Sequence, residues 1–364
     1  MPGWDDLFVT PLATWWQKLR ALRYGPPGLA EGDAERSALF CAALEQSEQF
    51  FRAAGTTDAV TRPLLLFYGL SQSGRALRAV ADPELWNQKT AAHGITVRNL
   101  ASANGLSMTV VADKGNGLFG AVARTLGRAT LGDGQTVGDL ARLGRLGPGF
   151  QLPGRDPDFP PLQLRLVSQG LFYEPGPLRA ELNVPGDTWA RRLPDVRVRT
   201  TADYDAYRAH VRSQLQHYPT LSEASLVEIP GYFDLDVLGG GERSVQLEWP
   251  DRAQPAPGAE DDALAAFGDE PGTEVTVYPR GHGSRQAVHP YLLWWAVLYA
   301  MSQYVRYEPT RWAQIIDVDS SEEAVAVEHL CDRALDLLPE LIYRSIARSG
   351  TESAVSTDGR QASP

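Results

Sequence analysis

The apolar positions of residues 291–301 follow one another almost without interruption, as Tyr-Leu-Leu-Trp-Trp-Ala-Val-Leu-Tyr-Ala-Met. A helix that is apolar on all sides is normally buried at the centre of a domain. A helix that crosses a bilayer needs about 20 such residues, so this run is too short to span one. We therefore expect the helix over residues 289–307 to be the central element of a fold without membrane segments.

Helical periodicity and helix-ending residues predict further helices at both ends of the chain. Gly55 ends one of them, and Pro63 lies in the first turn of the next, where its missing N–H costs little. Gly69 and Gly74 lie inside that helix, and each glycine destabilises a helix by about 1 kcal/mol relative to alanine. We therefore expect that a neighbouring helix or a ligand approaches closely at these positions. The predicted helices cover residues around 15–23, 31–54, 62–81, 204–217, 289–307, 309–316 and 320–347.

Short runs with a strand-like composition, separated by Gly and Pro, follow between about residues 94 and 248. The segment 251–272 combines Pro, Gly and acidic residues, which predicts an acidic, poorly ordered loop. Residues 349–364 are polar without apolar periodicity, and we expect a disordered tail there. The predicted strands cover residues 107–112, 162–167, 224–229, 244–248 and 274–278.

The order of helices, mixed strands and helices predicts an α+β fold. We expect a mostly helical body formed by both chain ends, with an inserted mixed α/β region of short strands. The helical domain would comprise residues 1–92 and 280–348, and the insertion residues 93–279. Buried-type helices at opposite ends of the sequence cover their apolar surfaces only if they pack together.

Net charge, cysteine content and the N-terminal segment limit which classes of function are possible. The net charge of -11 over 364 residues disfavours sequence-independent binding of nucleic acid by the whole surface, although a local basic groove stays open. Cys41 and Cys331 are the only cysteines, so we expect neither a disulfide framework nor a zinc site. Residues 1–10 lack a basic region followed by an apolar stretch, so we expect no signal peptide and a cytoplasmic location.

The densest polar cluster precedes the central helix and contains Arg280, His282, Arg285 and His289. Backbone N–H groups at a helix start favour an anion, and Arg and His side chains bind phosphate or exchange protons near neutral pH. The cluster resembles the Arg and His motif of HEPN-type ribonucleases, which work without metal, although only three residues separate Arg285 from His289. The alternative is a glycine-rich loop with a capping cluster.

A second candidate is the G-x-G-x-x-G pattern of Gly115, Gly117 and Gly120, which follows a strand-like run and precedes a helix-like run. In a dinucleotide-binding fold such glycines let pyrophosphate approach a helix N-terminus, and Asp139 lies 19 residues further on. No apolar second strand leads to Asp139. We favour a simple turn between a strand and a helix, because a lone match to this pattern is weak.

Two further residues, His93 and Arg306, are candidates for ligand binding together with Arg280. His93 precedes a glycine, and Arg306 ends the central helix, where the helix dipole alone favours a cation. The simpler interpretation is therefore a histidine in a turn and an arginine at a helix end. In the functional alternative, Arg306 lines a pocket with His93.

A basic stretch next to Trp189 contains Arg191, Arg192, Arg197 and Arg199. Basic residues beside an aromatic ring bind single-stranded nucleic acid in some proteins, but a solvated surface strand fits the acidic chain better. Metal-protease, P-loop and nucleophile-elbow patterns are absent from the sequence. We expect no cofactor and no metal ion.

Three stretches resemble the YaaC-like protein family: residues 62–70, residues 93–95, and residues 289–312 with their Arg-Tyr-Glu-Pro turn and tryptophan. The resemblance spans residues 16–346 in patches. It departs from the family at residues 72–74 and in the loop 251–272. The family has no established activity, so the resemblance helps to define the fold and leaves the function open.

The sequence leads to two hypotheses about function. The first is a cytoplasmic binding or interaction protein, whose partner is a protein or a phosphate-bearing ligand. The alternative is a metal-independent HEPN-like ribonuclease, or another enzyme that acts on a phosphate-bearing substrate. In that case His282, Arg285 and His289 would be catalytic and Arg280 would bind the ligand.

Overall fold

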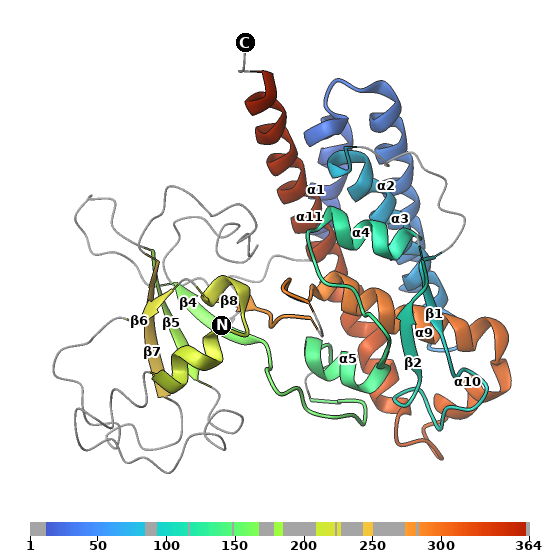
Figure 1. Cartoon of the computed structure of the whole chain (residues 1–364). Helices are drawn as coiled ribbons and strands as arrows, with labels where there is room; N and C mark the ends of the chain where they lie inside the picture. The colour runs from blue at the N-terminus through green and yellow to red at the C-terminus, as the bar shows by residue number, and fades with distance from the viewer. Residues whose placement is uncertain are drawn as a thin grey trace, which may run out of the picture. The chain divides into compact units, whose positions relative to one another are not determined.

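The computed structural model describes residues 12–83, 93–115, 117–147, 149–166, 178–184, 209–222, 224–226, 243–249, 274–281 and 284–361 (Figure 1). The chain forms two compact units. Met1–Asp156 and His289–Pro364 make the first, here called the helical unit, and Pro157–Val288 make the second, called the sheet unit. Helices combined with two small antiparallel sheets confirm the predicted α+β class.

Helix α9 (Pro290–Tyr307) is the core of the helical unit, and every residue from Tyr291 to Tyr304 is buried. Helix α3 (Arg62–Ala81) packs against it. The Tyr291 hydroxyl donates a hydrogen bond to the Leu70 carbonyl at 3.0 Å and shares another of 2.7 Å with the Ser73 hydroxyl. Segments from opposite ends of the chain therefore meet, as the sequence predicts. Within the described ranges, no helix combines the length and the apolarity that a bilayer crossing requires.

Four further helices surround this pair: α1 (Leu12–Tyr24), α2 (Ala34–Ala54), the short α10 (Pro309–Ile315) and α11 (Ala324–Gln361) (Figure 1). The Trp15 ring of α1 lies 5.5 Å from the Tyr343 ring of α11. Trp312 of α10 donates its indole N–H to the Ala59 and Val60 carbonyls at 3.1 Å each. These contacts again join the first third of the chain to the last.

Helix α11 continues to Gln361, whereas we expected a disordered tail over residues 349–364. Extending an existing helix forms one more hydrogen bond for each residue that is ordered, so a polar sequence can continue it. The segment between Pro339 and Gln361 contains no further proline that would interrupt the helix.

Two glycines of α3 explain how closely its neighbours approach. A Cβ atom at Gly74 would lie 2.7 Å from the Trp295 ring of α9, and one at Gly69 would lie 2.7 Å from the Phe51 ring of α2. Both distances are shorter than van der Waals contact. The close neighbouring helix expected from the sequence is therefore present at both positions.

A small antiparallel sheet also belongs to the helical unit, in the order β1 (Ile95–Val97), β2 (Val110–Asp113) and β3 (Gln135–Thr136). Helices α4 (Leu118–Thr125) and α5 (Val137–Gly144) follow its strands and contact α9. The Phe119 ring, for example, lies 6.2 Å from the Trp295 ring. The units consequently divide after Asp156, whereas we expected the inserted region to begin at residue 93.

The sheet unit contains a five-stranded antiparallel sheet in the order β6-β7-β5-β4-β8. Residues 209–215 are helical, and their Val211 and Leu215 side chains pack with the apolar strand residues in one core. The predicted loop 251–272 and the basic stretch 191–199 lie outside the described residues. The strands are β4 (Leu162–Leu166), β5 (Leu178–Val184), β6 (Ser225–Leu226), β7 (Arg243–Trp249) and β8 (Glu274–Val277).

Replacing Gly74 by alanine tests the contact between α3 and α9. Alanine improves helix propensity by about 1 kcal/mol, but its methyl group would meet the Trp295 ring, and overpacking a core costs about 1–3 kcal/mol. We expect Gly74→Ala to lower the free energy of unfolding measured with urea. Gly25→Ala is the matched control, because nothing lies within 4 Å of the added Cβ. Equal stability of the two variants would contradict this packing.

Candidate functional site

His289 immediately precedes α9 and caps its N-terminus. Its Nδ1 atom accepts a hydrogen bond of 3.1 Å from the Tyr291 backbone N–H, and the residue is only 8% exposed. A ring nitrogen that accepts a hydrogen bond carries no proton, so this arrangement holds one imidazole nitrogen in its acceptor form. The structure therefore gives His289 a capping role, which was the alternative to catalysis in the sequence analysis.

The arginines of the same predicted cluster belong to the sheet unit. Arg280 and Arg285 are both exposed. Arg280 pairs with Ala287 in an isolated antiparallel bridge, and its backbone N–H donates to the His217 carbonyl at 2.8 Å. His282 lies outside the described residues. Because these arginines and His289 are in different units, a joint site remains a prediction.

Gly115 and Gly117 lie between β2 and α4, and Gly120 lies in the first turn of α4. Gly115 has φ +58°, and Gly117 is the N-cap of the helix. A Cβ atom at Gly94 would lie 2.7 Å from the Gly117 Cα atom, so two backbone segments touch here. Strand β2 pairs antiparallel with both neighbours, whereas a dinucleotide-binding fold needs parallel strands. Gly115 thus supplies a positive φ, and Gly117 provides the helix cap and this close approach.

His93 lies at the junction of β1, α3 and α9. Its ring centroid is 5.3 Å from that of Phe67 and 5.8 Å from that of Tyr299. Burial lowers the pKa of the imidazole, and the positive charges of Arg306 and Arg75 lower this pKa further. The structure therefore brings His93 and Arg306 close enough for their charges to interact.

Arg306 extends from the last turn of α9 toward α3. Its Nη1 atom donates to the Tyr68 hydroxyl at 3.3 Å, and its guanidinium lies 4.9 Å from the centre of the Tyr307 ring. Among the described residues, no carboxylate forms an ion pair with Arg306. Its positive charge is therefore available to a ligand.

Helical spacing explains why these side chains gather. Tyr68 and Arg75 are seven residues apart on α3, and Tyr299 and Arg306 are seven residues apart on α9. Residues at this spacing lie on one face of a helix, two turns apart. The pairing of one aromatic and one basic residue on each helix was the sequence signal for this cluster, and it becomes visible only when the partner helix is known.

Gln303 was not predicted as a site residue. It lies one turn after Tyr299 on α9, it is 8% exposed, and its buried Nε2 atom has no hydrogen-bond acceptor in the part of the chain that the structure describes. An unsatisfied buried donor costs about 1–3 kcal/mol, so such a group in a folded protein calls for a partner. A polar residue inside an otherwise apolar run was the available sequence signal. We call His93, Arg75, Arg306, Tyr68, Tyr299 and Gln303 the cationic cluster.

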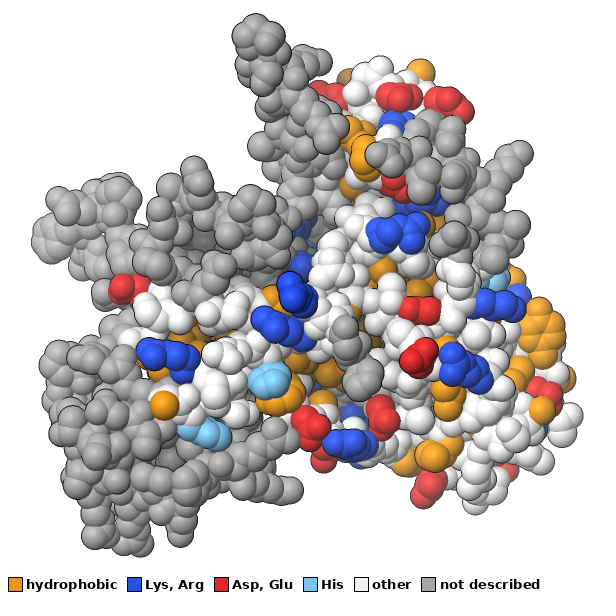
Figure 2. Space-filling model, viewed as in Figure 1, with side chains coloured by type: hydrophobic (Ala, Val, Ile, Leu, Met, Phe, Trp, Pro, Cys, Tyr) orange, Lys and Arg blue, Asp and Glu red, His pale blue; other side chains and the backbone are white. Residues whose placement is uncertain are grey.

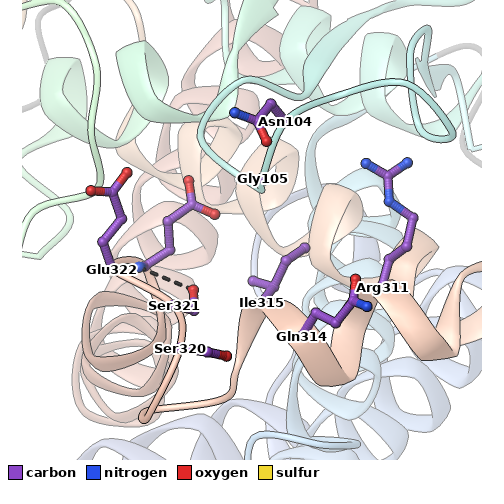
Figure 3. A pocket seen from close by; sticks show the side chains of 9 residues that line it. Asn104, Gly105, Arg311, Gln314, Ile315, Ser320, Ser321 and Glu322 are labelled. Carbon is purple, nitrogen blue, oxygen red and sulfur yellow. Dashed lines mark hydrogen bonds between the residues drawn. The ribbon is translucent and has the colours of Figure 1, made fainter.

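A concave site of about 470 Å³ lies where α10 is joined to α11 (Figure 3). Glu323, 5% exposed, accepts hydrogen bonds from the Leu106 and Ser107 N–H groups at 2.6 and 2.8 Å. Arg311 donates to the Leu100 carbonyl at 2.7 Å and to the Ala103 carbonyl. The sequence analysis did not identify this pocket, because the hydrogen bonds that shape it join residues more than 200 positions apart.

The fold and these sites define an α+β protein with a buried aromatic helix and two polar sites in its helical unit. No group of three or more His, Cys, Asp and Glu side chains within the described ranges is arranged to hold a metal ion. The YaaC-like protein family model matches residues 15–346, so the chain belongs to that family, as the resemblance implied. No curated protein and no solved structure gives a significant match.

Stability should depend on pH through His93. Above a pH of about 6.5 the imidazole is neutral in both the folded and the unfolded chain, so it does not make the free energy of unfolding depend on pH. Below it the unfolded chain takes up a proton more readily, because folding lowers the pKa of this group. We expect the free energy of unfolding to fall between about pH 7 and pH 5.5, and to fall less in His93→Gln. Urea unfolding of both proteins at several pH values measures this dependence. If the free energy of unfolding changes with pH equally in the two proteins, the prediction is wrong.

The capping role of His289 predicts a contrast between two substitutions. Asparagine is a good N-cap, whereas alanine cannot accept the Tyr291 N–H, and losing a cap costs about 1 kcal/mol. We expect His289→Ala to lower the thermal midpoint of unfolding and His289→Asn to stay closer to the unmodified protein. An equal loss in both variants would show that the imidazole does more than cap.

Proposed function

We propose that this YaaC-like protein is a binding protein whose cationic cluster takes a phosphate-bearing or similarly anionic ligand. The observation that carries the proposal is that Arg306 and Arg75 both lower the pKa of His93, while Arg306 has no carboxylate partner among the described residues. Positive charges gathered without a counter-charge repel one another, and an anion between them removes that repulsion.

The donors of the cluster suit a phosphate group. A guanidinium has five N–H groups in a planar fork that matches phosphate oxygens. Within the described residues, Arg306 uses them in two hydrogen bonds, to the Ser302 carbonyl and the Tyr68 hydroxyl. The unsatisfied Nε2 of Gln303 adds a neutral donor on the same helix. Together these groups would contact both a charged and an uncharged part of one ligand.

The charge distribution favours a small ligand over nucleic acid. The chain carries a net charge of -11, which repels a long polyanion. On the face that Figure 2 shows, acidic and basic side chains of the helical unit are interspersed rather than gathered into one basic surface. A local cationic site in such a protein suits a small anion, and a cytoplasmic phosphate-bearing compound is the class that we propose.

Binding without catalysis is also supported by where the candidate residues lie. His289 and Arg306 are at opposite ends of α9, and 17 residues of helix place them about 25 Å apart at 1.5 Å per residue. They cannot act on the same atom. The HEPN-like alternative, which relies on His282, Arg285 and His289, would have to function with a histidine that caps a helix.

Calorimetric titration with inorganic pyrophosphate tests this function. We expect binding that weakens about tenfold in Arg306→Gln, because a charge-assisted hydrogen-bond donor is lost, and that strengthens as the pH falls and His93 takes up a proton. Arg98→Gln is the matched control, since Arg98 is an exposed arginine of the same unit outside the cluster. Absent binding, or equal binding by both variants, would refute the proposal.

A further inference from the structure

The pocket between α10 and α11 presents opposite charges on opposite sides. Figure 3 shows Glu322 on one side, Arg311 on the other, and Gln314 and Ile315 between them. The loop around Asn104 and Gly105 closes the top. Its volume of about 470 Å³ falls within the range of about 300–1,000 Å³ that is typical of small-molecule sites.

The charged groups deepest in this pocket are held in place. The two oxygens of Glu323 each accept one backbone N–H, and a Cβ atom at Gly105 would lie 2.7 Å from one of them. Arg311 is fixed by the Leu100 and Ala103 carbonyls. Groups that are already ordered lose little conformational freedom when a ligand binds, so they are suited to recognition.

These groups also retain unused bonding capacity. A carboxylate accepts about four hydrogen bonds, of which Glu323 uses two, and a guanidinium donates five, of which Arg311 uses two. The side chains of Glu322, Gln314 and Asn104 form no hydrogen bond with any described residue. The pocket therefore offers acceptors on its acidic side and donors on its basic side.

The lining excludes several ligand classes. Ile315 is the one large apolar side chain among the lining residues, so an apolar ligand would find little surface to bury. The two carboxylates would repel a phosphate or a polyanion. Within the described residues, no arrangement of three metal-ligating side chains is present that could hold a cation here.

From this arrangement we propose that the pocket binds a small zwitterion with one ammonium and one carboxylate group, of the free amino acid type. The ammonium group donates to Glu322 and Glu323, and the carboxylate group accepts from Arg311 and Gln314. This site shares no residue with the cationic cluster, so the inference is independent of the proposed anion binding.

Calorimetric titration of the full chain with a series of amino acids of increasing length tests the charge pairing. The probes are glycine, γ-aminobutyrate and ε-aminocaproate, compared with butylamine and butyrate, which each carry one of the two charges. We expect at least one amino acid to bind about tenfold more tightly than both single-charge probes. If none does, the proposal is wrong.

Substitutions then assign the binding to this pocket. Glu322→Gln removes an exposed charge that makes no described contact, so the fold should persist, and we expect the best amino acid to bind about fivefold more weakly. Glu328→Gln, at an exposed acid of α11 outside the pocket lining, is the matched control and should leave the affinity unchanged. Equal affinity of Glu322→Gln and the control would place the binding elsewhere and overturn the proposal.

Arg306→Gln separates the two sites of the helical unit. Because Arg306 does not line the pocket, we expect this variant to bind the amino acid with unchanged affinity even where it no longer binds pyrophosphate. Loss of both ligands in Arg306→Gln would contradict an independent zwitterion site.

Discussion

The contact between α3 and α9 is the interaction on which the rest of the helical unit depends. The two helices approach closely because Gly74 leaves room for the Trp295 ring, and the Tyr291 hydroxyl finds partners at Ser73 and Leu70. A tyrosine hydroxyl this deeply buried would cost stability without such partners, and burial raises its pKa well above the usual range. Apolar packing and hydrogen bonding therefore specify the same arrangement.

The same helix pair positions the cationic cluster. Phe67 contacts Tyr299, and the next residue of α3, Tyr68, accepts a hydrogen bond from Arg306, which lies two turns beyond Tyr299 on α9. His93 lies two residues before β1, and the Phe119 N–H donates to its carbonyl at 2.9 Å. A polar site at the edge of an aromatic core is thus a consequence of how that core packs.

The hydrogen bonds that Arg311 and Glu323 form with loop 99–107 also connect distant parts of the chain. Arg311 donates to the Leu100 and Ala103 carbonyls of this loop, and Glu323 accepts from its Leu106 and Ser107 N–H groups. Gly105, at φ +91°, allows the Glu323 carboxylate to come within reach. Arg311 and Glu323 both line the pocket, so the same charged side chains that hold the loop would also contact a bound ligand.

The sequence alone determined the α+β class, the long helices and the meeting of the two chain ends, because an uninterrupted apolar run can only be covered by other apolar helices. It also indicated His93 and Arg306, but not Gln303, Arg75 or the pocket around Glu323. Those depend on which turns of separate helices face each other, on antiparallel pairing of very short strands, and on hydrogen bonds between residues more than 200 positions apart. Periodicity describes one helix face at a time, so only the tertiary structure decided which faces share a site.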